Sequence, residues 1–293
     1  MNEHLDPFTP GQLAQLACVL EATARKPGNV HRYRDFAETT YLDFLLSALA
    51  ISASLDRASE QSLGRTILDS VAATRRLVGT NTNLGMILLL APLASVPIGE
   101  ELRPGLARVL DSSTTADAKL VYQAIRLAKP GGLGQVADQD IDAEPTVTLR
   151  AAMSLAADRD LIARQYDNGY HEIFDQIYPS LKQSIEAGFP LETAILTAFI
   201  QFLAADLDTL IVRKRGVEMA REASSKASEV LERGWPDTLA GIDAFVQFDE
   251  WLRADGNARN PGATADLTTA ALFVALRDGT IKFPMDQVWS HPS

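Results

Sequence analysis

The segment TPGQLAQLACVL, Thr9–Leu20, carries the first clear indication of the fold class. Thr9 is suited to an N-cap, Pro10 to the first helical turn, and Gln12 completes a capping box three residues after the cap. The apolar residues that follow share one face of a helical period, and they are Leu13, Leu16, Ala17 and Leu20. The segment therefore predicts an amphipathic α-helix.

The same helical spacing continues along almost the whole chain. Helix starts such as Thr40 with Asp43 precede further apolar faces, and we find no convincing alternating strand, fixed-period repeat or low-complexity tract. Helices are expected near residues 9–20, 40–51, 63–78, 84–94, 102–110, 116–128, 146–187 with breaks near 169 and 179, 191–232 with a break at 216, 239–252 and 265–276. The sequence thus predicts an all-α fold, a single-domain bundle of roughly ten or more helices over residues 1–293.

Composition indicates a globular protein without a general affinity for polyanions. Of its 293 residues, 46% are hydrophobic and 22% are charged, which is ordinary for a folded chain. The 38 acidic and 27 basic residues give a formal net charge of -11, and this excess disfavours nucleic acid or an anionic membrane as the main partner. A nucleotide needs only a local cluster of Lys, Arg and backbone N–H groups, so the charge does not disfavour a nucleotide ligand.

Cysteine, histidine and apolar segments point to the cytoplasm. The single cysteine, Cys18, lies in an apolar helical stretch, so we expect a buried structural thiol. The four histidines are far apart and lack metal-ligand spacing, which argues against a zinc site. The start, MNEHLDPFTP, lacks the basic and apolar regions of a signal peptide. The most apolar stretch, Leu84–Val96, contains Pro92 and is shorter than the roughly 20 residues that span a bilayer, so we expect no membrane contact.

The junction Lys26-Pro27-Gly28-Asn29 ends the first helix and admits two interpretations. In the first, Lys26 places a cation at the helix C-terminus while Pro27 and Gly28 stop the helix. In the second, Lys26 supplies a point charge and Gly28 lets backbone N–H groups approach an anion, which would form a phosphate clamp.

The junction Asn81-Thr82-Asn83 stands directly before the most apolar helix and is similarly open. One Asn or Thr as an N-cap would account for it. A helix N-terminus is also an anion site, and three amide or hydroxyl side chains exceed what one cap requires. Either a cap or a phosphate site is therefore expected here.

Two carboxylates beside apolar faces are candidates for chemistry. Asp208 adjoins the apolar face of a predicted helix, and Arg213 follows one to two turns later, where it could meet phosphate oxygens. The apolar face consists of Leu203, Leu207, Leu210 and Ile211. Asp266 follows the tight turn Asn260-Pro261-Gly262, where it either caps a helix or holds magnesium. For Arg213, a basic last helical turn before Gly216 is the alternative.

Other polar motifs are weaker. Gly131-Gly132-Leu133-Gly134 is neither a P-loop nor a dinucleotide fingerprint, because no strand precedes it. Asp138, Asp140 and Asp142 alternate as at the start of an EF-hand loop, but the required Gly and distal Glu are missing, so solvated acids are expected. Without a Ser-His-Asp or Cys-His set, the sequence favours chemistry by carboxylates, Mg²⁺ and basic or amide groups around phosphate.

Taken in order, these junctions resemble the triphosphoribosyl-dephospho-coenzyme A synthase family, which is all-helical and makes the prosthetic-group precursor of citrate lyase and malonate decarboxylase. The resemblance covers about residues 21–276. The matching positions are Glu21 with Lys26-Pro27-Gly28, Asp43 and Ser47, Asn81-Thr82 with Gly85, Asp208-Thr209 followed by Arg213, and Pro261-Gly262 with Ala265-Asp266-Leu267.

The resemblance implies a transfer reaction on ATP. The 2′-hydroxyl of dephospho-coenzyme A attacks the anomeric carbon of ATP, adenine leaves, and the triphosphate stays on the ribose, through a transition state like an oxocarbenium ion. The implied catalytic carboxylates are Asp43, Asp208 and Asp266, with Asp208 and Asp266 also the implied ligands of Mg²⁺. The implied phosphate-binding residues are Lys26, Gly28, Asn81, Thr82, Asn83 and Arg213.

One departure places the chain in a divergent branch. The classical synthases carry Asn-Thr-His-Lys-Gly where this chain has Asn81-Thr82-Asn83-Leu84-Gly85, and the segment Tyr122–Tyr166 also matches them poorly. The acceptor is therefore dephospho-coenzyme A or a related molecule. Two alternatives stay open: a Mg²⁺-dependent hydrolase that cleaves an N-glycosidic or phosphate bond of a nucleotide, and a helical binding protein without catalysis. A homodimer would be typical of a helical enzyme of this kind.

Overall fold

The computed structural model describes residues 8–129, 143–285 and 289. Within these residues the regular secondary structure is all helical, joined by turns and loops, with one isolated bridge between His31 and Arg34. The prediction of an all-α fold is confirmed. The helices are α1 (Pro10–Thr23), α2 (Tyr41–Asp56), α3 (Leu63–Leu77), α4 (Leu84–Ala94), α5 (Leu102–Asp111), α6 (Thr115–Ala128), α7 (Leu149–Ser154), α8 (Leu161–Asn168), the π-helix η1 (Ile173–Ile177), α9 (Tyr178–Glu186), α10 (Leu191–Ala205), α11 (Thr209–Arg215), α12 (Val217–Glu232), α13 (Leu239–Arg253) and α14 (Gly262–Arg277).

Helix starts follow their local signals. The predicted capping box of α1 is present, since Thr9 accepts from Gln12 N and the Gln12 side chain accepts from Thr9 N. Thr40 and Asp43 form the same arrangement at α2. These capping boxes give hydrogen-bond partners to first-turn N–H groups that have none inside the helix, so the starts of α1 and α2 could be predicted from the sequence.

Two long predicted helices are divided differently from the expectation. The region 146–187 breaks at Gly169 as predicted and has a further interruption at residues 155–160. Pro179 does not break it, because it occupies the first turn of α9, where a proline N–H is not needed. The region 191–232 has a second interruption between α10 and α11, in addition to the predicted one at Gly216. No single described helix is both long and apolar enough to cross a membrane; α10 and α11 pass such a test only jointly, across a bend of 56°.

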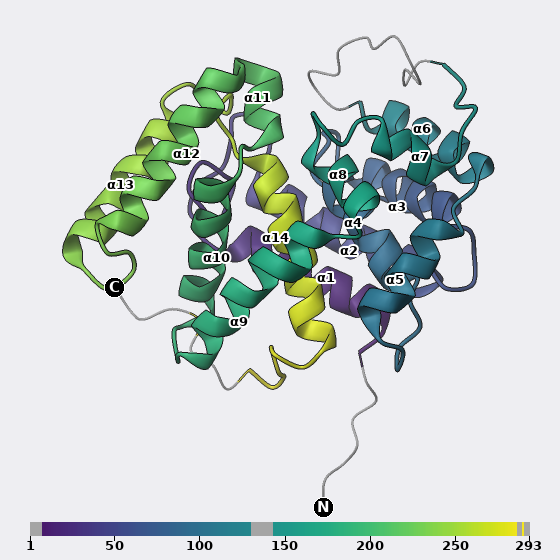
Figure 1. Cartoon of the computed structure of the whole chain (residues 1–293), viewed down its shortest axis with the longest axis horizontal. Helices are drawn as coiled ribbons and strands as arrows, with labels where there is room; N and C mark the ends of the chain where they lie inside the picture. The colour runs from purple at the N-terminus through teal and green to yellow at the C-terminus, as the bar shows by residue number, and fades with distance from the viewer. Residues whose placement is uncertain (1–7, 130–142, 286–288, 290–293) are drawn as a thin grey trace, which may run out of the picture.

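Helix α14 is the central element of the fold. In Figure 1 it runs through the middle of the molecule, with α2, α3 and α4 on one side and α10 and α11 on the other. Thirteen of its 16 residues are buried, as expected for a helix surrounded by others. One core cluster joins α1 to α10 with α14, a second joins α10 to α13, and α10 and α14 contribute residues to both. The turns around the N-termini of α14 and α4 therefore meet in the interior.

A proline inside α4 has a specific partner. Pro92 lacks an N–H, so the carbonyl of Leu88 one turn earlier loses its helical hydrogen bond. The hydroxyl of Tyr166 donates to that carbonyl at 2.6 Å, and Tyr170 donates to the next one, Leu89, at 3.0 Å. Both tyrosines are fully buried, so α8 and the residues after it supply the hydrogen bond that the Leu88 carbonyl of α4 lacks within its helix.

We expect Tyr166→Phe to lower the free energy of unfolding by about 1–2 kcal/mol, because the buried Leu88 carbonyl would lose its donor. Urea denaturation measures the change. The matched control is Pro92→Ala, which supplies a backbone N–H to the same carbonyl. In the Pro92→Ala background the cost of Tyr166→Phe should shrink; an equal cost in both backgrounds would contradict this explanation.

Candidate active site

A cavity of about 900 Å³ lies where the helix junctions meet. Its wall comes from the end of α1, the segment before α2, the junction before α4, the ends of α6 and α7, the start of α8, α11 and the start of α14. Of the predicted site residues, five line it: Asn81, Thr82, Asn83, Arg213 and Asp266. Four lie outside the described lining: Lys26, Gly28, Asp43 and Asp208.

The junction before α4 is held by its own side chains. Asn81 accepts from Leu84 N at 3.2 Å, and the Thr82 hydroxyl lies 2.5 Å from that of Ser47. The N-cap Asn83 makes no capping bond within the described chain; instead its amide donates to Thr74 Oγ1 at 3.2 Å. Leu84, Gly85 and Met86 of the first turn line the cavity, and beyond Leu84 N, which Asn81 caps, the N–H groups of Gly85 and Met86 have no described acceptor, as at an anion site.

Asp266 packs directly against this turn. A Cβ at Gly85 would lie 2.0 Å from Asp266 Oδ2, so only glycine allows α4 and α14 to approach in this way. The Asp266 carboxylate is half-buried, and it accepts no hydrogen bond from any described residue. Burial, followed by the charge of Glu21, raises its pKa well above the usual value, while Arg213 opposes the shift. Asp266 is therefore a carboxylate in need of a cation or a proton.

Helix α11 supplies cations to the same cavity. The side chain of Arg213 is 30% exposed, and its described ion pair is a loose one with Asp160 at 3.8 Å. Lys214 donates to the Asn257 carbonyl at 3.2 Å, and burial, followed by the charge of Arg213, lowers its pKa. Both cations retain donors for a ligand, since a guanidinium has five and an ammonium three.

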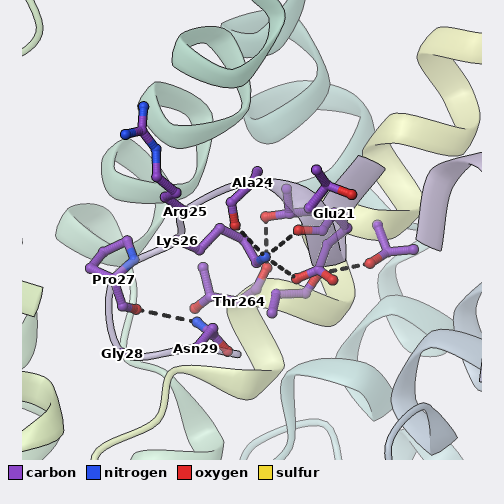
Figure 2. Close-up of polar contacts among 12 residues, drawn as sticks. Glu21, Ala24, Arg25, Lys26, Pro27, Gly28, Asn29 and Thr264 are labelled. Carbon is purple, nitrogen blue, oxygen red and sulfur yellow. Dashed lines mark hydrogen bonds and ion pairs between the residues drawn. The ribbon is translucent and has the colours of Figure 1, made fainter. Parts of the chain in front are cut away.

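Lys26 does not reach the cavity. Its side chain is fully buried, and its ammonium lies 3.0 Å from Glu21 Oε1. The ammonium also donates to the main-chain carbonyls of Glu21 and Ala24. Figure 2 shows it turned back onto the end of α1. The residue that lines the cavity is its partner Glu21, which the sequence marked only through the family motif.

Asp208 occupies a capping position. It is fully buried, and its Oδ1 accepts from Leu210 N and Ile211 N at 2.8 and 3.1 Å. Its Oδ2 accepts from Thr264 N and Thr264 Oγ1 at 2.7 and 2.8 Å. We expected a metal or cationic partner for a buried carboxylate; the described partners are four N–H and O–H donors instead, because Asp208 joins α11 to α14.

Asp43 and Gly28 also have local structural partners. Asp43 completes the capping box of α2, where its carboxylate accepts from Thr40 N at 2.7 Å. Gly28 has a positive φ of 72°, and its N–H donates to Asp249 Oδ1 at 2.7 Å. A Cβ at Gly28 would lie 2.8 Å from Leu252 Cβ, so this glycine packs on α13.

Sequence reasoning missed several residues of the cavity wall. Beside Glu21, which only the family motif had marked, the further charged and amide residues that line it are Asn29, Glu38, Arg75, Lys129, Arg159, Asp160, Lys214, Asn257 and Asn260. Asn260 donates to Asn29 Oδ1 at 2.7 Å, which ties the segment after α1 to the turn before α14. A single Arg or Lys at a helix end looks the same in the sequence whether it lines a cavity or faces solvent, so these residues could not be predicted. The motifs Gly131–Gly134 and Asp138, Asp140 and Asp142 lie outside the described residues.

An all-helical protein with amides, cations and an unpaired carboxylate around one cavity is suited to an anionic small molecule. The profile of the CitG family, ATP:dephospho-CoA triphosphoribosyl transferase, matches residues 7–283. The chain therefore belongs to this family of transferases. The predicted family is confirmed.

Relatives agree with this assignment. A Pseudomonas savastanoi pv. phaseolicola protein named as a 2-(5''-triphosphoribosyl)-3'-dephosphocoenzyme-A synthase is 28% identical over 219 residues, which is 73% of this chain and 67% of the relative. An Azotobacter vinelandii protein of the same name is 26% identical over 226 residues, covering 76% and 70%. A crystal structure from Archaeoglobus fulgidus, named for a triphosphoribosyl-dephospho-CoA synthase, matches with a TM-score of 0.63 at 25% identity, covering 80% of this chain and 99% of that one.

Proposed function

We propose that this protein transfers the triphosphoribosyl group of ATP to dephospho-CoA or a related acceptor and releases adenine. The observation that carries the proposal is the convergence of family motifs on one cavity. Glu21, Asn81-Thr82 with Gly85, Arg213 and Asp266 are far apart in the sequence, and all of them line the same space. That space also has the size range of a ligand pocket.

The triphosphate binds between α4 and α11 in this proposal. The N–H groups of Gly85 and Met86 at the start of α4 would donate to phosphate oxygens, and Arg213 and Lys214 would neutralise the phosphate charge. Arg75 and Lys129 add positive charge on the α3 and α6 side, suited to the phosphates of the acceptor. The ribose then lies near Asp266, whose carboxylate would stabilise positive charge at the anomeric carbon.

Magnesium enters this proposal with the nucleotide. In the described part of the chain no three His, Cys, Asp or Glu side chains converge on a metal position. Mg²⁺ is commonly held by one or two carboxylates together with substrate phosphates, and Asp266 is a free carboxylate of the kind it requires. When bound, the ion would neutralise charge on the triphosphate. Chelation of Mg²⁺ by EDTA should abolish activity, and full activity in EDTA would remove the ion from the proposal.

We expect Arg213→Ala to weaken ATP binding by roughly 10- to 100-fold, because one charge-assisted contact to phosphate is worth about 1.5–3 kcal/mol. Isothermal titration calorimetry measures the affinity. Arg221→Ala is the matched control, since Arg221 lies on α12 and pairs with Glu218 at 2.6 Å. Equal affinities of the Arg213 and Arg221 variants would place the triphosphate elsewhere.

The deciding experiment measures adenine by chromatography after incubation with ATP, Mg²⁺ and dephospho-CoA. Adenine that appears only with the acceptor, together with an acceptor product heavier by the triphosphoribosyl mass, supports the transferase. Adenine or phosphate released without an acceptor would identify the hydrolase instead. No turnover with any acceptor would favour a binding protein. The homodimer and the cytoplasmic location stay predictions, which light scattering and cell fractionation measure.

A further inference from the structure

The buried ion pair of Glu21 and Lys26 takes no part in the proposed binding of the triphosphate. Glu21 lies near the end of α1 and is 2% exposed, yet it lines the cavity. Lys26 lies five residues later in the turn after α1 and is fully enclosed. An ion pair removed from water is costly to form, so its retention beside a reactive cavity needs an explanation.

Lys26 is committed to the end of α1. An ammonium has three N–H donors, and Lys26 has three described acceptors, namely Glu21 Oε1 at 3.0 Å, the Ala24 carbonyl at 3.2 Å and the Glu21 carbonyl. Figure 2 shows these contacts around its nitrogen, while Arg25 points away from the cluster. No donor of Lys26 is left for a phosphate. Its contacts instead fix the main chain and the side chain of Glu21 together.

Glu21 presents an acceptor to the cavity. Oε1 faces Lys26, and Oε2 accepts no hydrogen bond from any described residue. The charge of Glu21 also acts on the Asp266 carboxylate, whose pKa is raised first by burial and then by Glu21. Two carboxylates of this cavity thus have different surroundings, since Glu21 has a cation at 3.0 Å and Asp266 has no described ion pair.

We infer that Glu21 is a catalytic residue that accepts the proton of the attacking hydroxyl, and that Lys26 is its positioning residue. The inference rests on the proposed function. The acceptor oxygen forms a bond to the anomeric carbon of ATP, and the bond from that carbon to the adenine nitrogen breaks. The bonding electron pair leaves with adenine, which takes a proton from solvent. The hydroxyl proton passes to Glu21, which returns it to solvent when the products leave.

The main test variant is Glu21→Gln combined with Lys26→Met. It removes both charges of the pair and so leaves no buried charge without a partner. We expect a folded protein by circular dichroism, an ATP dissociation constant within about threefold of the wild type, and a kcat for adenine release lower by 100-fold or more. Lys26→Met alone should likewise reduce kcat and leave the ATP dissociation constant unchanged.

The matched control is Glu192→Gln. Glu192 is also a buried carboxylate, 1% exposed and paired with Arg25 at 3.0 Å, but it lies outside the described cavity lining. Its variant should lose stability and keep kcat within a few fold. A folded double variant with a kcat within tenfold of the wild type, or with ATP binding lost, would overturn the assignment of Glu21. If the wild type itself releases no adenine, the proposed function fails instead.

Discussion

Replacement of Asp266 by asparagine is expected to slow adenine release by about 10²- to 10⁴-fold and to leave the protein folded. Asparagine has nearly the same shape, so it fits the space beside Gly85. It carries no negative charge, however, and cannot stabilise a positive anomeric carbon or a metal ion. The rate of adenine formation at saturating ATP and acceptor measures the loss.

The stability of the same variant separates catalysis from folding. Because burial raises the pKa of Asp266 above its unfolded value, folding favours its protonated form. The stability that this group contributes is therefore present at low pH and is lost as the pH rises through the folded pKa. Asparagine cannot ionise and avoids that loss, so the free energy of unfolding of Asp266→Asn at pH 8 should equal or exceed that of the wild type.

The control for Asp266 is Asp158→Asn, because the Asp158 side chain is 82% exposed and its described ion pair is with its neighbour Arg159. That variant should change neither rate nor stability. A folded Asp266→Asn protein with a normal rate would falsify the catalytic role of Asp266. A variant that unfolds would show instead that the charged carboxylate holds α4 and α14 together.

Local signals were sufficient for most of the fold. The capping residues Thr9 and Thr40 satisfy N–H groups within a few residues of themselves, so the starts of α1 and α2 could be read from the sequence. The interruption between α10 and α11 depends on a distant contact. Asp208 stands in an apolar run that has helical spacing, but its side chain caps α11 and accepts from Thr264, which lies 56 residues later. A local sequence pattern around Asp208 does not include Thr264, so the interruption could not be predicted from it.

The sequence predicted which helix junctions form the site, but it did not predict which of their side chains point into the cavity. Asn81, Thr82, Arg213 and Asp266 line the cavity as expected from their motifs. Lys26 turns inward to Glu21 and to the carbonyls at the end of α1, although a cation in this place could also face a phosphate. The direction depends on whether an acceptor is buried nearby, which is a property of the packed interior.

Asp208→Asn is expected to give the opposite result to Asp266→Asn, with stability reduced and catalysis retained. Each oxygen of Asp208 accepts from at least one backbone N–H group, and these hydrogen bonds oppose the rise in its pKa that burial causes. An amide nitrogen in place of either oxygen would face an N–H group and leave a buried donor without an acceptor. Such a loss costs roughly 1–3 kcal/mol of the free energy of unfolding, or about 2–5 °C of melting temperature.

Urea denaturation and adenine release measured on one preparation test both parts of this prediction. The matched control is Asp206→Asn, two residues earlier, where a 28% exposed carboxylate pairs with Arg164 at 2.7 Å and should be worth less than about 1 kcal/mol. If Asp208→Asn keeps its stability and loses metal-dependent activity by orders of magnitude, Asp208 is a metal ligand as the family motif implies. If stability falls while the folded fraction keeps its kcat, the contribution of Asp208 is to hold the junction of α11 and α14 together, and Asp266 remains as the carboxylate that acts on the substrate.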